Sequence, residues 1–141
     1  MRTTSHIAGS AVRVLVVDDE SDNRELIEVI LLWEGFAVEL APSGKAALEM
    51  VAKQHPHIIL LDLMMPGMDG YQVTTALRAD PSTKDIPVML VTALSPQGPA
   101  GERARRVGAQ EILMKPFDRD ELTSHVKALL EKTYAADYTQ T

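Results

Sequence analysis

Residues 60–70 of the chain read LLDLMMPGMDG, and this stretch decides the fold. The apolar run from Ile58 to Leu61 leads directly into Asp62, and the loop that follows is rich in Gly and Pro. A short, continuous apolar run is typical of a strand that is covered on both faces of a sheet. Beyond the loop, the spacing of residues 71–78 predicts an amphipathic helix. The stretch therefore predicts a buried strand, an acidic strand end, a loop and a helix.

The same unit recurs on both sides of this stretch. Apolar runs predict strands at 12–17, 36–40, 58–61, 88–91 and 112–114. Capping residues and apolar spacing predict helices from Ser21 as N-cap to Gly35, from Ser43 to Lys53, over 71–78, over 102–107, and from Asp118 to Lys132. Strands that alternate with helices form a parallel sheet with helices on both faces, because the crossovers are right-handed. The fold class is α/β, doubly wound.

Composition limits the functions that the chain can have. Its 141 residues suit one domain with a single core. A net charge of −6 argues against direct binding of nucleic acid, and no apolar run is long enough to span a membrane. There is no cysteine, and residues 1–10 lack the apolar core of a signal peptide, so we expect a cytoplasmic protein. We expect a flexible leader at 1–11, one domain at 12–132, and a tail at 133–141 that extends the last helix or is disordered.

Polar side chains follow four of the predicted strands at the point where each strand ends. The first strand ends in Asp18 and Asp19, the third in Asp62, the fourth in Thr92 and the fifth in Lys115. In a doubly wound sheet, the carboxyl ends of the strands line the site. A single acid after a strand is more often a helix cap than a functional group, but we expect five such residues to meet in one pocket.

The residue types in this pocket predict a metal site and phosphoryl transfer. Three carboxylates repel one another unless a cation neutralises them, and hard oxygen ligands that retain water suit Mg²⁺. Lys115 and Thr92 can then contact a phosphoryl group, with Asp62 as the nucleophile. The alternative for Lys115 is a structural ion pair with Asp18 or Asp62.

The chain resembles the receiver domain of two-component response regulators over about 12–132. Four motifs carry the resemblance: VLVVDDE at 14–20, LLDLMMPGMDG at 60–70, VMLVTA at 88–93 and LMKPFD at 113–118.

The resemblance implies a flavodoxin-like fold with strand order 2-1-3-4-5 and a role for each site residue. Asp62 would accept a phosphoryl group from a sensor histidine kinase or a histidine phosphotransfer protein. Asp19, Asp62 and the backbone carbonyl of Met64 would bind Mg²⁺ directly, and Asp18 would bind it through water. Lys115 would contact the phosphate, Thr92 would move toward it, and the bond from Lys115 to Pro116 would be cis. Such a protein catalyses only its own phosphorylation and dephosphorylation and is otherwise not an enzyme.

Two departures from the family pattern lie where the signal leaves the domain. The position on the fifth strand that is usually aromatic is Ile112, which offers no ring to fill the space that Thr92 vacates. The segment SPQGPAGE at 95–102 contains two prolines and two glycines, and proline inside a helix costs about 3 kcal/mol. We therefore expect the fourth helix to be short and to start at about Glu102. The fourth helix, fifth strand and fifth helix form the family's usual output surface and a route to a homodimer.

Several functional alternatives remain open at this stage. A phosphatase of the haloacid dehalogenase type would need a DxDxT pattern after the first strand, where this chain reads DDESD at 18–22. A flavodoxin-like cofactor binder would need a phosphate-binding loop at the same place. Only nine residues follow Lys132, so we expect output by phosphorylation-dependent docking on a downstream protein target. The alternatives are a phosphorelay intermediate that passes the phosphoryl group onward and a receiver that acts as a constitutive interaction module.

Overall fold

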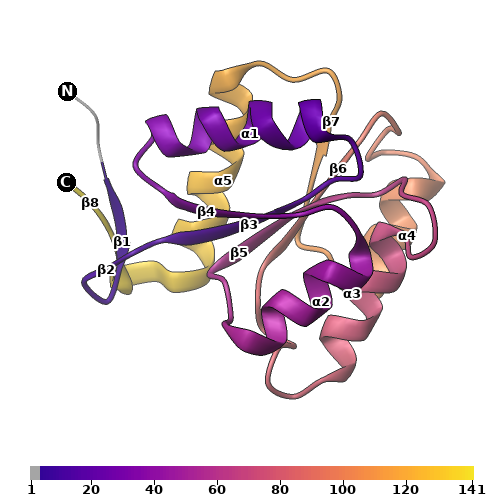
Figure 1. The fold of residues 1–141 in the computed structure, drawn as a ribbon, viewed down its shortest axis with the longest axis horizontal. Helices are drawn as coiled ribbons and strands as arrows, with labels where there is room; N and C mark the ends of the chain where they lie inside the picture. The colour runs from indigo at the N-terminus through magenta and orange to yellow at the C-terminus, as the bar shows by residue number, and fades with distance from the viewer. Residues whose placement is uncertain (1–3) are drawn as a thin grey trace.

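Five parallel strands form the central sheet of the computed structural model, which describes residues 4–141 (Figure 1). The strands are β3 (Arg13–Val17), β4 (Ala37–Ala41), β5 (Ile58–Asp62), β6 (Val88–Thr92) and β7 (Glu111–Met114), in the order β4-β3-β5-β6-β7. All four neighbouring pairs are parallel. Counted from β3, the order is 2-1-3-4-5, as expected. The sheet reverses its direction of progression between β3 and β5, where ligands bind in folds of this kind.

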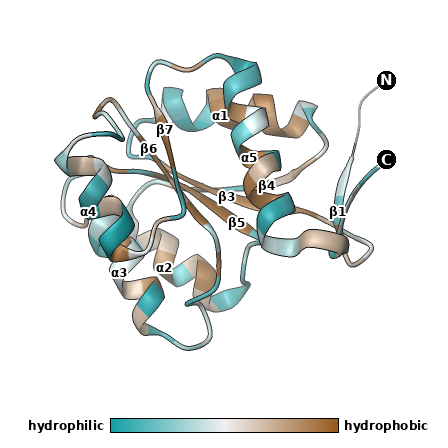
Figure 2. Cartoon of the chain, turned by 180° about the vertical axis from the view of Figure 1, so that it is seen from behind, coloured by the Kyte–Doolittle hydropathy of each residue, from teal (hydrophilic) through white to brown (hydrophobic). Residues whose placement is uncertain are grey.

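Helices cover both faces of this sheet. They are α1 (Ser21–Trp33), α2 (Gly44–Lys53), α3 (Gly70–Ala79), α4 (Pro99–Val107) and α5 (Arg119–Tyr134). α1 and α5 pack on one face, and α2, α3 and α4 pack on the other, so the sheet separates two apolar cores. Figure 2 shows the central strands as largely hydrophobic and the surrounding helices as a mixture of hydrophobic and hydrophilic residues. In the part of the chain that the structure describes, no helix is long and apolar enough to cross a membrane.

Local capping chemistry explains most of the helix starts. Asp118 and Glu121 form the predicted capping box of α5, and the Ser43 hydroxyl accepts a hydrogen bond from Ala46 N at the start of α2. The expectation for α1 was wrong by one residue, since Glu20 is the N-cap and Ser21 is already helical. The reason is that the Asp18 carboxylate accepts a hydrogen bond from Glu20 N at 2.9 Å and organises this turn.

The fourth helix starts earlier than the sequence predicted. It begins at Pro99, not near Glu102, and Gly98 is its N-cap. Proline is tolerated at the first helical position because its missing N–H has no partner there in any helix. Gly101 allows the preceding loop to fold back tightly, since a Cβ at this position would lie 1.8 Å from the Pro96 carbonyl oxygen. The two glycines and Pro99 therefore build a compact helix start.

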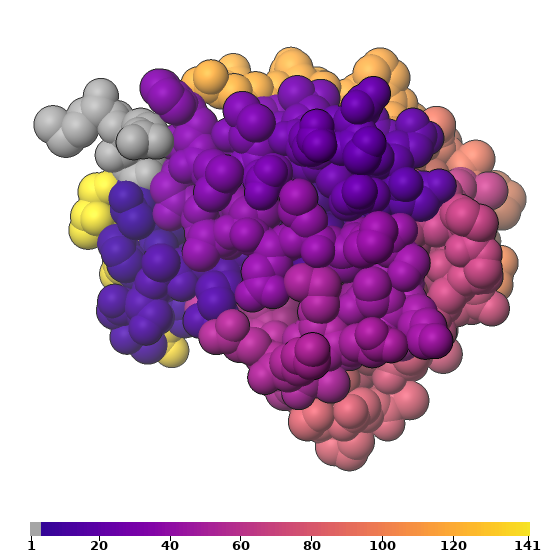
Figure 3. Space-filling model, viewed as in Figure 1, coloured from indigo at the N-terminus to yellow at the C-terminus, as the bar shows by residue number. Residues whose placement is uncertain are grey.

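Regular secondary structure is present near both ends of the described chain, where we expected a flexible leader at 1–11 and a tail at 133–141 that extends the last helix or is disordered; α5 extends two residues past Lys132, to Tyr134. β1 (Ser5–Ile7) pairs with β2 (Ser10–Ala11) and with β8 (Tyr138–Gln140) in an antiparallel sheet of order β2-β1-β8. A 3-10 helix, Ala135–Asp137, connects α5 to β8. The buried Tyr138 hydroxyl lies 2.9 Å from Ser5 Oγ, and the N- and C-terminal residues form one end of the surface (Figure 3). Residues 1–3 of the expected leader lie outside the described residues.

Candidate functional site

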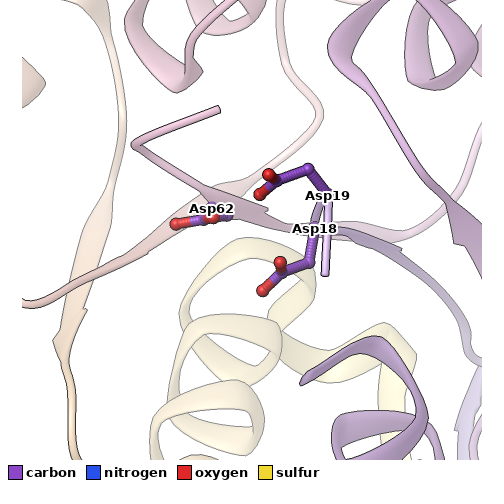
Figure 4. A group of neighbouring side chains, drawn as sticks. All are labelled: Asp18, Asp19 and Asp62. Carbon is purple, nitrogen blue, oxygen red and sulfur yellow. The ribbon is translucent and has the colours of Figure 1, made fainter. Parts of the chain in front are cut away.

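Three carboxylates meet at the carboxyl ends of β3 and β5, as the sequence predicted. Asp18 and Asp19 follow β3, and Asp62 is the last residue of β5; the three side chains lie together in Figure 4. One oxygen from each carboxylate lies within 4.8 Å of the others. Asp18 and Asp62 are only 2% and 7% exposed, whereas Asp19 is open to solvent. Two of the three charges are therefore held largely out of water.

The backbone next to Asp62 packs so closely that position 70 must be glycine. α3 begins against the end of β5, and Gly70 N donates a hydrogen bond to the Leu63 carbonyl at 2.9 Å. A Cβ at Gly70 would lie 2.9 Å from Leu63 Cα and 3.0 Å from the Asp62 carbonyl oxygen, which only glycine avoids. Met64 N lies 3.4 Å from Asp62 Oδ1 and donates to it. The loop that predicted the fold thus also fixes the position of the Asp62 carboxylate.

Lys115 supplies the positive charge of the site. Its Nζ lies 3.6 Å from Asp62 Oδ1 and 3.8 Å from Asp18 Oδ2, so it pairs with both buried carboxylates. Lys115 N donates to the Thr92 carbonyl at 2.7 Å, which joins the ends of β6 and β7. The peptide bond from Lys115 to Pro116 is cis, as expected. The ion pair that the sequence analysis gave as the alternative for Lys115 is present, and it leaves a phosphate-binding role open.

Burial sets the proton affinity of the central carboxylate. It raises the pKa of Asp62 from 3.8 to about 6 because the charged form loses water. Lys115 and the N–H of Met64 oppose this rise in pKa, while Asp18 and Asp19 add to it by repulsion. At pH 7 the Asp62 side chain is therefore mostly a carboxylate, and Asp18 and Asp19 repel its charge.

This shift predicts a pH-dependent effect of Asp62→Asn on the stability of the metal-free protein. A carboxyl group with a raised pKa in the folded state binds its proton more tightly there, so stability falls as pH rises from about 4 to about 6. The two-unit shift corresponds to at most about 3 kcal/mol, and solvent access reduces this to about 1–2 kcal/mol. In EDTA at pH 7.5, we expect Asp62→Asn to raise Tm by about 2–8 °C.

Thermal unfolding of both proteins from pH 4 to pH 7.5 checks this prediction. The difference in Tm should shrink as the pH falls and be small near pH 4, where Asp62 is protonated in the folded chain and close to half protonated in the unfolded chain. Asp120→Asn removes an exposed carboxylate from the first turn of α5 and serves as the charge-matched control. An equal Tm for wild type and Asp62→Asn at pH 7.5 would contradict the repulsion described above.

Thr92 and Ile112 share one tightly packed region beside the site. Thr92 is buried, and its Oγ1 accepts a hydrogen bond from Leu94 N at 3.2 Å. The side chains of Thr92, Ile112 and Ala104 line the same space between β6, β7 and α4, which is too full to hold a water molecule. Movement of Thr92 would therefore be felt directly by Ile112 and by α4.

Arg24 is a site residue that the sequence analysis missed. Its guanidinium donates from Nη1 to the Asp18 carbonyl at 2.7 Å. No sequence pattern predicts a hydrogen bond from a side chain to a backbone carbonyl six residues away. Tyr71 was missed for the same reason: its hydroxyl donates to the Ala100 carbonyl at 3.0 Å, and Arg103 lies 4.2 Å above its ring. Tyr71 thus joins α3 to α4.

The donor set of this pocket fits a hard divalent cation. Three carboxylates within 4.8 Å of one another are too close to remain charged together at low energetic cost without a positive partner. Lys115 balances only one of the three charges. Oxygen ligands select Mg²⁺, Ca²⁺ or Mn²⁺ over softer metals, and exposed Asp19 leaves one side open to water and ligands.

Comparison with known proteins identifies the family. A family model described as the response regulator receiver domain matches residues 14–127. The chain belongs to the response regulator receiver family. The response regulator PleD of Caulobacter vibrioides is 44% identical over 119 residues, which are 84% of this chain and 26% of PleD. The response regulator MprA of Mycobacterium ulcerans is 40% identical over 129 residues, which are 90% of this chain and 53% of MprA. The receiver domain thus spans about a quarter to a half of these relatives.

Solved receiver structures have the same architecture. The chemotaxis protein CheY4 of Vibrio cholerae is 29% identical with a TM-score of 0.79, and the match covers 84% of this chain and 98% of CheY4. The signal receiver domain of a histidine kinase from Syntrophus aciditrophicus is 33% identical with a TM-score of 0.81, covering 89% of this chain and 95% of that domain. The flavodoxin-like receiver fold and the role in two-component signalling follow from these matches.

Proposed function

We propose that Asp62 is the phosphoacceptor of this receiver domain and that the donor is a phosphohistidine on a sensor histidine kinase or a histidine phosphotransfer protein. The observation that carries the proposal is the position of Asp62, which ends β5 beside Lys115 and two further carboxylates. An Asp62 oxygen would attack phosphorus, the bond from phosphorus to the histidine nitrogen would break, and the released imidazole would take up a proton. The protein's own phosphorylation and dephosphorylation are the only reactions in this proposal.

Lys115 and Thr92 would stabilise the phosphorylated form. The Lys115 ammonium lies 3.6 Å from Asp62 Oδ1 and could move to a phosphoryl oxygen with a small displacement. Thr92 ends the neighbouring strand β6 and carries a hydroxyl that can donate to a second phosphoryl oxygen. Charge on the transferred group would then be balanced by groups that are already in place, which is how proteins accelerate phosphoryl transfer.

Mg²⁺ is the metal that we infer for the acidic pocket. Asp19, Asp62 and the Met64 carbonyl would hold it directly, and Asp18 would hold it through a water molecule. The ion would neutralise charge on the carboxylates and on the incoming phosphoryl group. The support for this inference is the spacing of the three carboxylates and the exposed position of Asp19.

The surface of α1 supports the choice of a helical phosphodonor protein. Four large apolar residues of this helix are exposed: Leu26 (56%), Val29 (63%), Leu32 (47%) and Trp33 (55%). A hollow of about 440 Å³ between α1 and the loop after β7 continues this surface to Lys115. Leu26 and Phe117 line it, so its walls are largely apolar. An apolar helix face placed here would bring a histidine on a partner helix to the acidic pocket.

Output is proposed to leave through the surface of α4, β7 and α5. Ile112 lies on β7 and packs in the same region as Thr92, so a shift of Thr92 would alter this surface first. A downstream protein target or a second copy of the domain would bind there. Arg105 of α4 lies beside Glu111 and Ile112 on this surface, whereas Arg103 stacks on Tyr71 of α3.

Phosphotransfer from purified histidine kinases and phosphotransfer proteins tests the proposed function. The wild-type protein should acquire label in Mg²⁺ and none in EDTA. Reduction with borohydride, which traps aspartyl phosphates, should modify Asp62 and no other residue. Label on a histidine, or trapping at another aspartate, would contradict the assignment. Label that passes back to a phosphotransfer histidine would mark a relay, whereas tighter target binding after phosphorylation would mark a docking switch.

Val29→Glu tests the donor surface separately. A charge in the middle of the exposed apolar face of α1 should reduce transfer from the kinase by at least about tenfold, because a buried unpaired charge in an interface is costly. Transfer from acetyl phosphate, which needs no docking surface, should remain at the wild-type rate. Ala79→Glu adds the same charge at an exposed position at the end of α3 and is the control. Equal losses with both donors would point to damage in the site.

A further inference from the structure

The hydrogen bond from Arg24 reaches the peptide group that connects two of the three carboxylate residues of the site. The Asp18 carbonyl that accepts the 2.7 Å hydrogen bond belongs to the peptide unit that joins Asp18 to Asp19. Among residues 4–141, the Arg24 guanidinium forms no ion pair with a carboxylate; the ion pairs there involve His125 and two lysines. Its guanidinium is therefore hydrogen-bonded to the backbone of the acidic turn, and its charge lies beside that turn.

Asp18 and Asp19 are held in very different ways. Asp18 N donates to the Ala41 carbonyl at 3.2 Å, its Oδ1 accepts from Glu20 N at 2.9 Å, and its Oδ2 lies 3.8 Å from Lys115 Nζ. The Asp19 carboxylate accepts no hydrogen bond within the described part of the chain and is exposed. The direction in which Asp19 leaves β3 is thus set only by the peptide groups beside it, and Arg24 holds one of these.

The hydrogen bond from Arg24 opposes the electrostatic repulsion among the three carboxylates. Without a cation, Asp19 lies next to two other carboxylates and is driven toward solvent. Because the Asp19 carboxylate accepts no hydrogen bond in the described chain, this repulsion can move it away from the pocket unless its backbone is held in place. The short hydrogen bond from Arg24 fixes the peptide plane, and the guanidinium is planar and always charged, so it remains a donor at every pH at which the protein folds.

We propose that Arg24 is a positioning residue of the metal site. It holds the Asp18–Asp19 peptide group so that both carboxylates face the pocket before a divalent cation arrives. Arg24 would act through Asp18 and would not touch the ion. Residues that orient metal ligands in this way typically contribute about 10–100-fold to metal affinity. The inference rests on the metal site of the proposed function and adds a residue that lies outside the four sequence motifs quoted above.

Metal affinity measured by calorimetry on the full chain tests this inference. Arg24→Met keeps the length of the side chain but removes the donor and the charge, and we expect it to raise the Mg²⁺ Kd about tenfold. Arg24→Lys retains a cationic donor and should restore at least part of this loss. Arg106→Met removes an equal charge from an exposed position on α4 and should leave Kd within about twofold of wild type.

Thermal unfolding with and without Mg²⁺ separates positioning from a purely structural role. Loss of a structural contact would lower Tm equally in EDTA and in Mg²⁺. Loss of positioning should instead shrink the rise in Tm that Mg²⁺ produces in wild type, because that rise depends on Kd. Equal Kd values for wild type and Arg24→Met, or equal losses in Arg24→Met and Arg106→Met, would overturn the inference. A wild-type chain that binds no Mg²⁺ would instead contradict the proposed function.

Discussion

The Asp62→Asn protein is expected to take up no phosphoryl group, from a phosphorylated kinase or from acetyl phosphate. The amide has nearly the shape of the carboxylate but lacks the negatively charged oxygen that attacks phosphorus. Its neighbours, Lys115 and the Met64 N–H, would remain in place to contact it. Intact-protein mass spectrometry after incubation in Mg²⁺ measures the effect directly, because the wild type should gain the mass of one phosphoryl group.

The control for this prediction must remove one carboxylate elsewhere. Asp120→Asn has the same change in charge at an exposed position on α5 and should be phosphorylated like the wild type. Label retained on Asp62→Asn at the wild-type level would show that another residue is the acceptor. The other acids of the pocket would then need to be examined first, since Asp18 is as deeply buried as Asp62.

Asp19→Asn is expected to weaken Mg²⁺ binding by at least about 100-fold, because the loss of a direct ligand should exceed the 10–100-fold effect of residues that only orient ligands. Asp19 is the exposed member of the carboxylate group and should be the one that an arriving ion meets first. Titration calorimetry gives Kd, and the rate of phosphorylation by acetyl phosphate at fixed Mg²⁺ should fall in parallel.

Asp22→Asn provides the comparison for Asp19→Asn. It removes an exposed carboxylate three residues away, in the first turn of α1. If long-range charge alone attracted the ion, both variants would weaken binding to a similar degree. A wild-type Kd for Asp19→Asn would rule this residue out as a ligand. A Kd that changes only in Asp19→Asn would support direct coordination.

The parts of the molecule that the sequence predicted are those governed by local rules. The capping box of Asp118 and Glu121 involves residues three apart, and the strand β5 is apolar at every position before its last residue, Asp62. The site was predictable because parallel strands bring their carboxyl ends together, whatever the loops between them do. The start of α4 was misplaced because Pro99 was weighed as a helix interior residue, while the helix uses it as its first residue.

The missed features depend on contacts between distant or unpatterned residues. β1 and β8 contain three residues each and show no alternation that a sequence could reveal, and their pairing joins positions more than 130 residues apart, as the bond between Ser5 and Tyr138 shows. The bond from Arg24 to the Asp18 carbonyl depends on the rotamer of a long side chain. Neither polar pattern nor propensity predicts such contacts, because both describe single elements and not their arrangement.

The pairing of β1 with β8 makes the receiver domain suitable for circular permutation. Thr4 and Thr141 exchange two backbone hydrogen bonds, at 2.8 and 3.0 Å, so a short linker from Thr141 to Thr4 could close β8 and β1 into a hairpin. New ends could then open in the exposed turn at 80–82, which lies at the amino end of β6 and far from the acidic strand ends. The carboxylates would keep their supporting strands, while the order of segments along the chain would change. Joined in this way, the domain could be inserted into a loop of another protein as a phosphorylation-responsive module.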